Sequence, residues 1–197
     1  MLSCLALACS PRKNGNTALL ARQALDACAA AGCATEYLHL AGFNYQPCQA
    51  CEGCNTTGRC VLKDDAGMLY EKILSADRII LAAPVYSMGI CAQAKTFIDR
   101  AQQFWAMKYL LKRSVISDQN RLARRGIFIS CAGSTLPGVF DGARQVANYF
   151  FKMLEIELLA SLCFDGVDHQ GEILNHTTAM TRATEYGRLL GESTKMP

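Results

Sequence analysis

The chain has 197 residues, a formal net charge of +3 at pH 7 and a hydrophobic content of 51%. This length suits one domain, predicted over residues 1–197, with enough apolar residues for a substantial core. The mild positive charge does not support a nucleic-acid partner, and no run approaches the roughly 20 apolar residues of a membrane helix. The N-terminus lacks the charged and longer apolar regions of a signal peptide, so we expect a cytoplasmic protein.

Apolar runs alternate with segments of helical periodicity along the whole chain. The predicted strands are residues 2–9, 34–40, 78–83, 126–131 and 156–163, and the predicted helices are 17–31, about 66–75, 90–106, about 139–154 and about 171–191. We expect Gly32 to end the first helix, Asp64 or Asp65 to cap the second, and Pro84 to end the third strand. The stretch 41–63 is a predicted loop, and 107–123 is polar and unassigned.

Five apolar strands separated by helices predict a parallel sheet that is covered on both faces. Right-handed crossovers make this a doubly wound α/β sheet. Such sheets bind ligands beyond the carboxyl ends of their strands, where the strand order reverses. We therefore expect the functional site in the loops after the first, third and fourth strands, the last of these being residues 130–134.

The loop after the first predicted strand, residues 10–17 (SPRKNGNT), is rich in hydroxyl, amide and cationic groups. The helix that follows offers unpaired N–H groups and the positive end of its dipole. This combination predicts a phosphate site, in which Gly15 permits a tight backbone path. The candidate ligands are Ser10, Arg12, Asn14, Asn16 and Thr17. The alternative is an ordinary polar turn in which Asn16 caps the helix.

The chain contains 11 cysteines, and four of them lie close together in a predicted loop of about residues 44–63: Cys48, Cys51, Cys54 and Cys60. In a reducing cytosol, dense cysteines bind metals or react more often than they form disulfides. A [4Fe–4S] cluster takes four thiolates, and so does structural zinc, although zinc loops commonly use a second Cys-x2-Cys pair. Redox thiols without metal are the third alternative. We expect Cys131 to line a pocket and assign the other cysteines no chemistry.

Three motifs together resemble a known family. Residues 10–17 resemble the NADPH-dependent FMN reductase group of flavodoxin-like proteins, as do residues 83–89 (APVYSMG) followed by 92–100 (AQAKTFIDR). Within that group, Pro47 and the four cysteines resemble the compact motif of the iron–sulfur flavoproteins. The resemblance is strong over residues 1–100 and implies a five-stranded sheet in the order 2-1-3-4-5. It also implies FMN, with its phosphate at residues 10–17 and its ring against Pro84, Val85, Tyr86, Ser87, Met88 and Gly89.

The resemblance further implies an FMN-dependent oxidoreductase that carries a [4Fe–4S] cluster beside the flavin. Ferredoxin or NAD(P)H would supply electrons, and a quinone, flavin, dioxygen or peroxide would accept them. In the family the cluster loop and the flavin can approach across a subunit interface, so we expect a homodimer or homotetramer. Three alternatives stay open: a cluster-free NAD(P)H-dependent FMN or quinone reductase, a flavodoxin-like electron carrier, and a flavin-free protein that binds phosphate esters.

Cationic residues gather in the stretch 108–125. They are Lys108, Lys112, Arg113, Arg121, Arg124 and Arg125. They could hold the 2′-phosphate of NADPH or attract an acidic electron-transfer protein. A solvated or subunit-contact surface is the more usual role of such a run. The three histidines, at positions 39, 169 and 176, join no visible constellation in the sequence.

Overall fold

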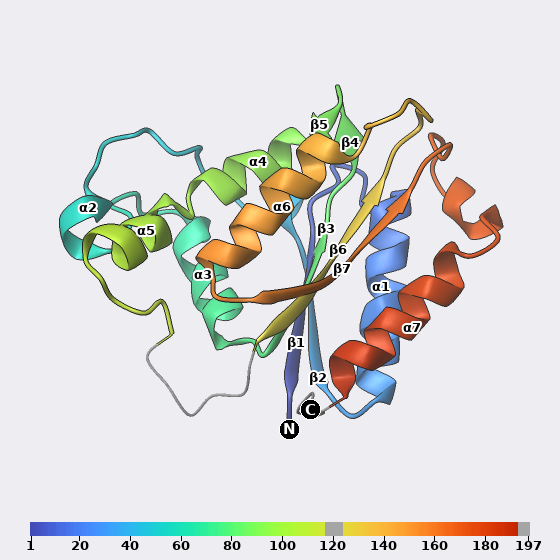
Figure 1. The fold of residues 1–197 in the computed structure, drawn as a ribbon, viewed down its shortest axis with the longest axis horizontal. Coiled ribbons are helices and arrows are strands. Elements are labelled where there is room, and N and C mark those ends of the chain that lie inside the picture. Colours follow the sequence, from blue (N-terminus) through green and yellow to red (C-terminus); the bar gives the residue numbers. More distant parts are fainter. Residues whose placement is uncertain (117–123, 193–197) are drawn as a thin grey trace.

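The computed structural model describes residues 1–116 and 124–192. Five parallel strands form its main sheet in the order β2-β1-β3-β6-β7 (Figure 1). These strands are β1 (Ser3–Ala8), β2 (Ala34–His39), β3 (Arg78–Ala82), β6 (Arg125–Cys131) and β7 (Glu157–Phe164). Renumbered along the chain, this is the predicted order 2-1-3-4-5 with its reversal between β1 and β3. The doubly wound flavodoxin-like fold is therefore confirmed.

The central strands are apolar because helices cover both of their faces. All of β3 and all but the first residue of β1 are buried, and Leu5 of β1 stands opposite Ile79 of β3. In β6 a methyl group at Gly126 would lie 2.5 Å from the ring of Phe151 and 2.8 Å from the carbonyl oxygen of Ile79. Glycine is thus required at this position for the sheet and a helix to approach each other closely.

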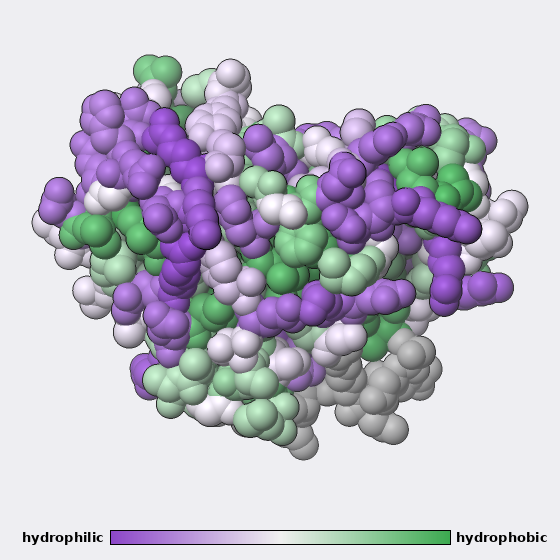
Figure 2. All heavy atoms as spheres, turned by 180° about the vertical axis from the view of Figure 1, so that it is seen from behind, coloured by the Kyte–Doolittle hydropathy of each residue, from purple (hydrophilic) through white to green (hydrophobic). Residues whose placement is uncertain are grey.

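Two helices pack on one face of the sheet and three on the other (Figure 1). The first pair is α1 (Asn16–Ala30) and α7 (Ala179–Gly191); the opposite group is α3 (Asp65–Ser75), α4 (Ala92–Asp99) and α6 (Asp141–Met153). Seen from behind, the surface is mostly hydrophilic, with small separate hydrophobic patches (Figure 2). Across residues 1–116 and 124–192, none of the helices combines the length and apolar character needed to span a bilayer.

Several predicted boundaries were wrong. The predicted helix 90–106 is divided, because the N–H groups of Arg100 and Ala101 bond to carbonyls three residues back and tighten the turn. A short helix α5 (Gln102–Trp105) and a π-helical turn η2 (Ala106–Leu110) follow. The last predicted helix begins only at Ala179, after a 3-10 turn η3 (Glu172–Asn175).

The long predicted loop contains two short helical elements of its own. They are a 3-10 turn η1 (Leu40–Gly42) and the helix α2 (Cys54–Thr57). The predicted cap after this loop is confirmed, since the Asp64 side chain accepts a hydrogen bond from the backbone N–H of Ala66 at 3.1 Å. The cysteine loop therefore has an ordered exit into α3.

The basic stretch is partly structural. Arg124 is buried and donates to the carbonyl oxygens of Ala76, Leu154 and Ile73, which lie at the ends of α3 and α6. Neither the predicted phosphate contact nor the predicted solvated surface applies to Arg124, because its charge serves to cap these two helices. Arg125 pairs with Glu157 at 3.1 Å. Arg121 lies outside the described residues.

Candidate functional site

Loops at the carboxyl ends of four strands enclose a small cavity of about 50 Å³. The predicted loops after β1, β3 and β6 all contribute to it, and so does the loop after β7, which the sequence did not predict. The lining residues are Ser10, Arg12, Gly15, Asn16, Thr17, Pro84, Val85, Tyr86, Cys131, Gly133, Val167 and Asp168. The topology thus brings together segments that are far apart along the chain.

The loop from β1 to α1 is tightly folded around Ser10. The Ser10 hydroxyl oxygen accepts from the backbone N–H of Arg12 at 3.1 Å, and a methyl group at Gly15 would lie 2.8 Å from that oxygen. Glycine therefore lets the loop close. Nε2 of His39 donates to the carbonyl oxygen of Ser10 at 2.7 Å, a supporting contact that the sequence did not reveal. The result is a compact turn that leads into the N-terminus of α1. The unpaired N–H groups of this first helical turn lie beside Thr17, which is buried.

The side chain of Asn16 is neither a helix cap nor a free ligand. Its Nδ2 donates to the carbonyl oxygens of Val167 and His169, at 3.3 and 3.0 Å. Its Oδ1 accepts from the backbone N–H groups of Gly171 and Ile173, at 2.9 and 3.4 Å. These four bonds use the whole amide, so Asn16 anchors the loop after β7. Asn16 nevertheless lines the cavity, so its contact with a ligand stays a prediction.

Two other predicted ligands of the first loop also bond within the protein. Oδ1 of Asn14 accepts from Nη1 of Arg22 at 3.3 Å, and Asn14 is not among the residues that line the cavity. Arg12 does line it, and its Nη1 donates to the carbonyl oxygen of Asp168 at 3.1 Å. The structure therefore separates Asn14 from the pocket and brings Ser10, Arg12, Asn16 and Thr17 to it.

The segment after β3 forms a hairpin of two short strands, β4 (Val85–Tyr86) and β5 (Gly89–Ile90). Ser87 and Met88 connect them with φ angles of 50° and 63°, the two left-handed residues of a type I′ turn. Only Pro84, Val85 and Tyr86 line the cavity; Ser87, Met88 and Gly89 form the turn and the returning strand. The predicted contact of residues 84–89 with the flavin ring stays a prediction, and Tyr86 keeps 46% of its surface exposed.

Cys131 lines this cavity as expected. Burial, with Cys163 as a secondary cause, raises the pKa of the Cys131 thiol to about 12. The thiol therefore stays protonated near neutral pH, and a protonated thiol is a poor nucleophile. Cys131 acts here as a wall of the pocket.

The donor set of this cavity fits the phosphate end of FMN. A hydroxyl, a guanidinium and the N–H groups of a helix start all suit a phosphate group. The cavity of about 50 Å³ is much smaller than whole-ligand sites, which enclose roughly 300–1,000 Å³. The remainder of a bound nucleotide would lie outside it, where the exposed ring of Tyr86 offers a flat surface.

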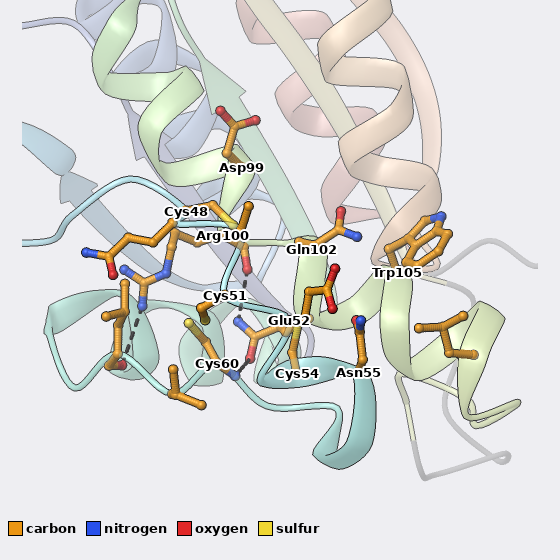
Figure 3. Close-up of a pocket in the computed structure, with 16 residues that line it drawn as sticks. Cys48, Cys51, Glu52, Cys54, Asn55, Cys60, Asp99, Arg100, Gln102 and Trp105 are labelled. Atoms are coloured by element: carbon orange, nitrogen blue, oxygen red, sulfur yellow. Dashed lines mark hydrogen bonds between the residues drawn. The ribbon is translucent and has the colours of Figure 1, made fainter.

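A second cavity, of about 650 Å³, lies beyond the other end of α4. Figure 3 shows the four cysteines of the loop around it, with Arg100, Gln102 and Trp105 on the facing wall. Cys48 and Cys51 are exposed, and Cys54 and Cys60 are half-buried. All four thiols of this short loop therefore line the same cavity, and metal binding by them stays a prediction.

The cysteine loop adopts a tight and partly strained path. Ala50 and Glu52 have φ angles of 51° and 60°, in the left-handed region that non-glycine residues rarely adopt. A methyl group at Gly53 would lie 2.5 Å from Cγ1 of Val61. Strain of this kind costs about 1–3 kcal/mol per residue and persists only where the surroundings impose it. The two left-handed residues, Ala50 and Glu52, flank Cys51, which lines the cavity.

Four thiolates are the ligand set of a [4Fe–4S] cluster and also of structural zinc. Within residues 1–116 and 124–192, no three His, Cys, Asp or Glu side chains converge closely enough to hold one metal ion. A [4Fe–4S] cluster gives each thiolate its own iron, so its ligands are spread more widely than those of zinc. Burial, reinforced by the other three thiols, raises the pKa of Cys54. Binding as thiolates would therefore need a cationic centre among them.

The two cavities share no lining residue. The hairpin at one of them leads directly into α4, and the other is lined by Asp99 and Arg100 at the end of that helix. Eight helical residues span about 12 Å. Within one chain, α4 therefore separates the predicted flavin pocket from the cysteines.

Comparisons with known proteins show the family of the chain. A family model described as NADPH-dependent FMN reductase matches residues 2–157. An iron-sulfur flavoprotein of Methanocaldococcus jannaschii is 44% identical over 93 residues, which are 47% of this chain and 48% of that protein. The iron-sulfur flavoprotein of Methanosarcina thermophila is 36% identical over 106 residues, 54% of this chain and 56% of that protein. The matches thus span about half the length of these relatives.

The fold is also shared with solved structures. An NAD(P)H:quinone oxidoreductase from Methanothermobacter marburgensis superposes with a TM-score of 0.69, covering 98% of each chain at 16% identity. At this identity the likeness concerns the fold alone.

Proposed function

Because this chain belongs to the NADPH-dependent FMN reductase family, we propose that it is an FMN-dependent oxidoreductase of the iron–sulfur flavoprotein type. It would pass electrons between ferredoxin or NAD(P)H and a small acceptor such as a quinone, a flavin, dioxygen or peroxide. One observation carries the proposal: four thiols from one loop line one cavity, at the far end of the helix that leads from the predicted flavin pocket.

The chain's own residues would bind and orient the two cofactors. FMN, when bound, exchanges two electrons with one partner and single electrons with another, and a cluster exchanges one at a time. Ser10, Arg12 and Thr17 would hold the FMN phosphate, and Asn16 would keep the covering loop in place. Pro84, Val85 and Tyr86 would support the ring. Cys48, Cys51, Cys54 and Cys60 would bind the cluster.

The position of the two sites favours an oligomer. In a single chain α4 lies between the cysteine cavity and the flavin pocket, so neither site completes the other. A second copy could place its cysteine loop against this chain's flavin. We therefore propose a homodimer or homotetramer in which the two centres approach across a subunit interface, and size measurement by light scattering tests this directly.

A cluster-free reductase is the second candidate, favoured by the description of the matching family model as NADPH-dependent FMN reductase. The two are separated by purifying the protein without oxygen and recording its visible spectrum together with its iron and sulfide content. Flavin bands with about four irons and four sulfides per chain support the proposal. Flavin without iron supports the cluster-free reductase, and a protein that stays colourless after FMN is added contradicts both.

The activity is tested separately. Turnover of NAD(P)H, or of reduced ferredoxin, with a quinone or dioxygen supports the oxidoreductase. A protein that carries both cofactors and turns over none of these pairs is an electron carrier instead.

A further inference from the structure

Arg100 lies at the end of α4 and faces the cysteine cavity, with only 2% of its surface exposed. Its Nη1 donates to the carbonyl oxygen of Gln46 at 2.9 Å, and its Nη2 donates to that of Leu62 at 3.4 Å. Gln46 precedes the first cysteine of the loop and Leu62 follows the last. One buried guanidinium thus ties together the two ends of the cysteine loop.

Asp64 completes this closure. Its Oδ2 lies 2.6 Å from Nη1 of Arg100 and its Oδ1 lies 3.1 Å from Nη2, which makes the pair bidentate. The same carboxylate accepts from the backbone N–H groups of Gln46 and Ala66, both at 3.1 Å. Because Gln46 lies at a loop end, Ala66 at the start of α3 and Arg100 at the end of α4, the pair fixes the loop to both helices.

Cys60 is held at the same corner. Its backbone N–H donates to Oε1 of Gln103 at 3.1 Å, and Nε2 of Gln103 donates to the carbonyl oxygen of Arg100 at 3.3 Å. Figure 3 shows Cys60 beside the guanidinium of Arg100. The fourth cysteine of the loop is therefore attached to Arg100 through Gln103 and also lies next to its charge.

One donor of Arg100 remains without an acceptor. A guanidinium has five N–H groups, and four of them face the acceptors above. Nε is buried and has no hydrogen-bond partner among the described residues. An unpaired buried donor is unfavourable, so an acceptor that becomes negative on metal binding would complete this site.

We propose that Arg100 is the positioning residue of the cysteine site: it closes the loop at both ends, and its Nε–H donates to the sulfur of Cys60 when that sulfur is a metal-bound thiolate. This inference rests on the proposed function, because it needs a cluster in the cavity. Hydrogen bonds to ligand sulfurs and nearby positive charge favour the reduced, more negative form of a cluster. Arg100 would therefore raise the reduction potential.

The decisive experiment measures the cluster's reduction potential by EPR-monitored titration in the full chain. Arg100→Gln removes the charge and is expected to lower the equilibrium constant for reduction of the cluster about tenfold. This corresponds to a reduction potential that is lower by about 59 mV for one electron. Arg100→Lys restores the charge and should recover part of this loss. Arg59→Gln is the control, because exposed Arg59 lies beside Cys60 in the same loop but is screened by solvent. Equal potentials in Arg100→Gln and the unsubstituted protein would overturn the proposal.

A second measurement does not need the cluster. Trypsin cleavage within the loop, after Arg59 or Lys63, should become about tenfold faster in metal-free Arg100→Gln because the loop can open locally. Lys95→Gln is the matched control on the same helix, since it breaks only the exposed pair with Asp99. Unchanged cleavage in Arg100→Gln contradicts the closure. Iron missing from the unsubstituted chain would instead contradict the proposed function, and the cleavage result would still decide whether Arg100 closes the loop.

Discussion

The two cavities joined by α4 are built in opposite ways. The predicted flavin pocket draws on four loops, and its Arg12 and Asp168 contact each other although they are 156 positions apart. The cysteine cavity takes all four thiols from one loop, and two residues at its edge, Arg100 and Asp64, close that loop. The first site depends on the order of the strands, whereas the second depends mainly on local sequence and one ion pair.

The two sites should respond differently to amino-acid substitutions. Changes in the cysteine loop should affect the metal site and leave the flavin pocket intact, because the two share no lining residue. A substitution in the flavin pocket should also disturb the other loops that build this pocket. Substitutions at each site therefore test whether the two behave as separate units.

The largest effect is expected for Cys51→Ala. Removing one of four thiolates leaves an iron without its ligand, so the variant should lose its iron almost completely while FMN content stays unchanged. Metal analysis and the visible spectrum after anaerobic purification measure both quantities. Cys163→Ala, a half-buried cysteine of β7, is the control and should keep its iron. Full iron retention in Cys51→Ala would show that this thiol is not a ligand.

Thr17→Val comes next and tests the flavin pocket. Losing a hydroxyl that bonds a charged phosphate costs about 1.5–3 kcal/mol, so the Kd for FMN should rise about 10- to 100-fold. Fluorescence titration of the FMN-free protein with FMN measures this. Asn14→Ala is the matched control from the same loop and should change the Kd less than about twofold, since Asn14 does not line the pocket. Equal effects of the two substitutions would show that the phosphate lies elsewhere.

Asn16→Ala should act on stability. The substitution removes four hydrogen bonds to the loop after β7 and leaves buried backbone groups unpaired, at a cost of about 2–3 kcal/mol. Urea unfolding measures the free-energy change. Gln23→Ala removes an exposed bond from the same helix to Thr184 and should cost less than about 0.5 kcal/mol. If the two variants are equally stable, Asn16 does not anchor the loop.

The smallest effect concerns pH at the edge of the cysteine loop. Burial alone would raise the pKa of Asp64, but the hydrogen bond from Arg100 and those from backbone N–H groups outweigh burial and lower it. A carboxyl with a lowered pKa in the folded state stabilises the protein above its unfolded pKa of about 3.9. This stabilisation is lost as the pH falls through the folded-state pKa.

Urea unfolding of the metal-free protein over this acid range tests the effect. Asp64→Asn keeps a capping side chain but cannot ionise, so it should lose stability less steeply than the unsubstituted protein as the pH falls. Parallel pH profiles for the two proteins would show that the ionised Asp64 carboxylate does not contribute this pH-dependent stabilisation.

Much of the fold could be predicted because its signals are local. Apolar runs such as residues 78–83 are readable as buried strands, and the Asp64 cap follows from residue type and position. The division of the helix at Arg100 was not readable, because residues 90–106 keep a continuous helical pattern. The tightened turn there places the Arg100 side chain against the carbonyl oxygens of Gln46 and Leu62, more than 30 positions earlier. Similarly, Arg124 looked like part of a charged surface and is in fact a buried cap for two helices.

By itself, the sequence determined the class of sheet and the four thiols of the cysteine loop, because both depend on residue type and short spacing. Only the tertiary structure decided which polar groups of residues 10–17 reach the pocket, since Asn14 and Asn16 bond elsewhere and the loop after β7 arrives from the end of the chain. It also decided the place of Arg100 at the base of the cysteine loop. Contacts of this kind depend on how strands and helices are ordered in space, and no local period in the sequence records that order.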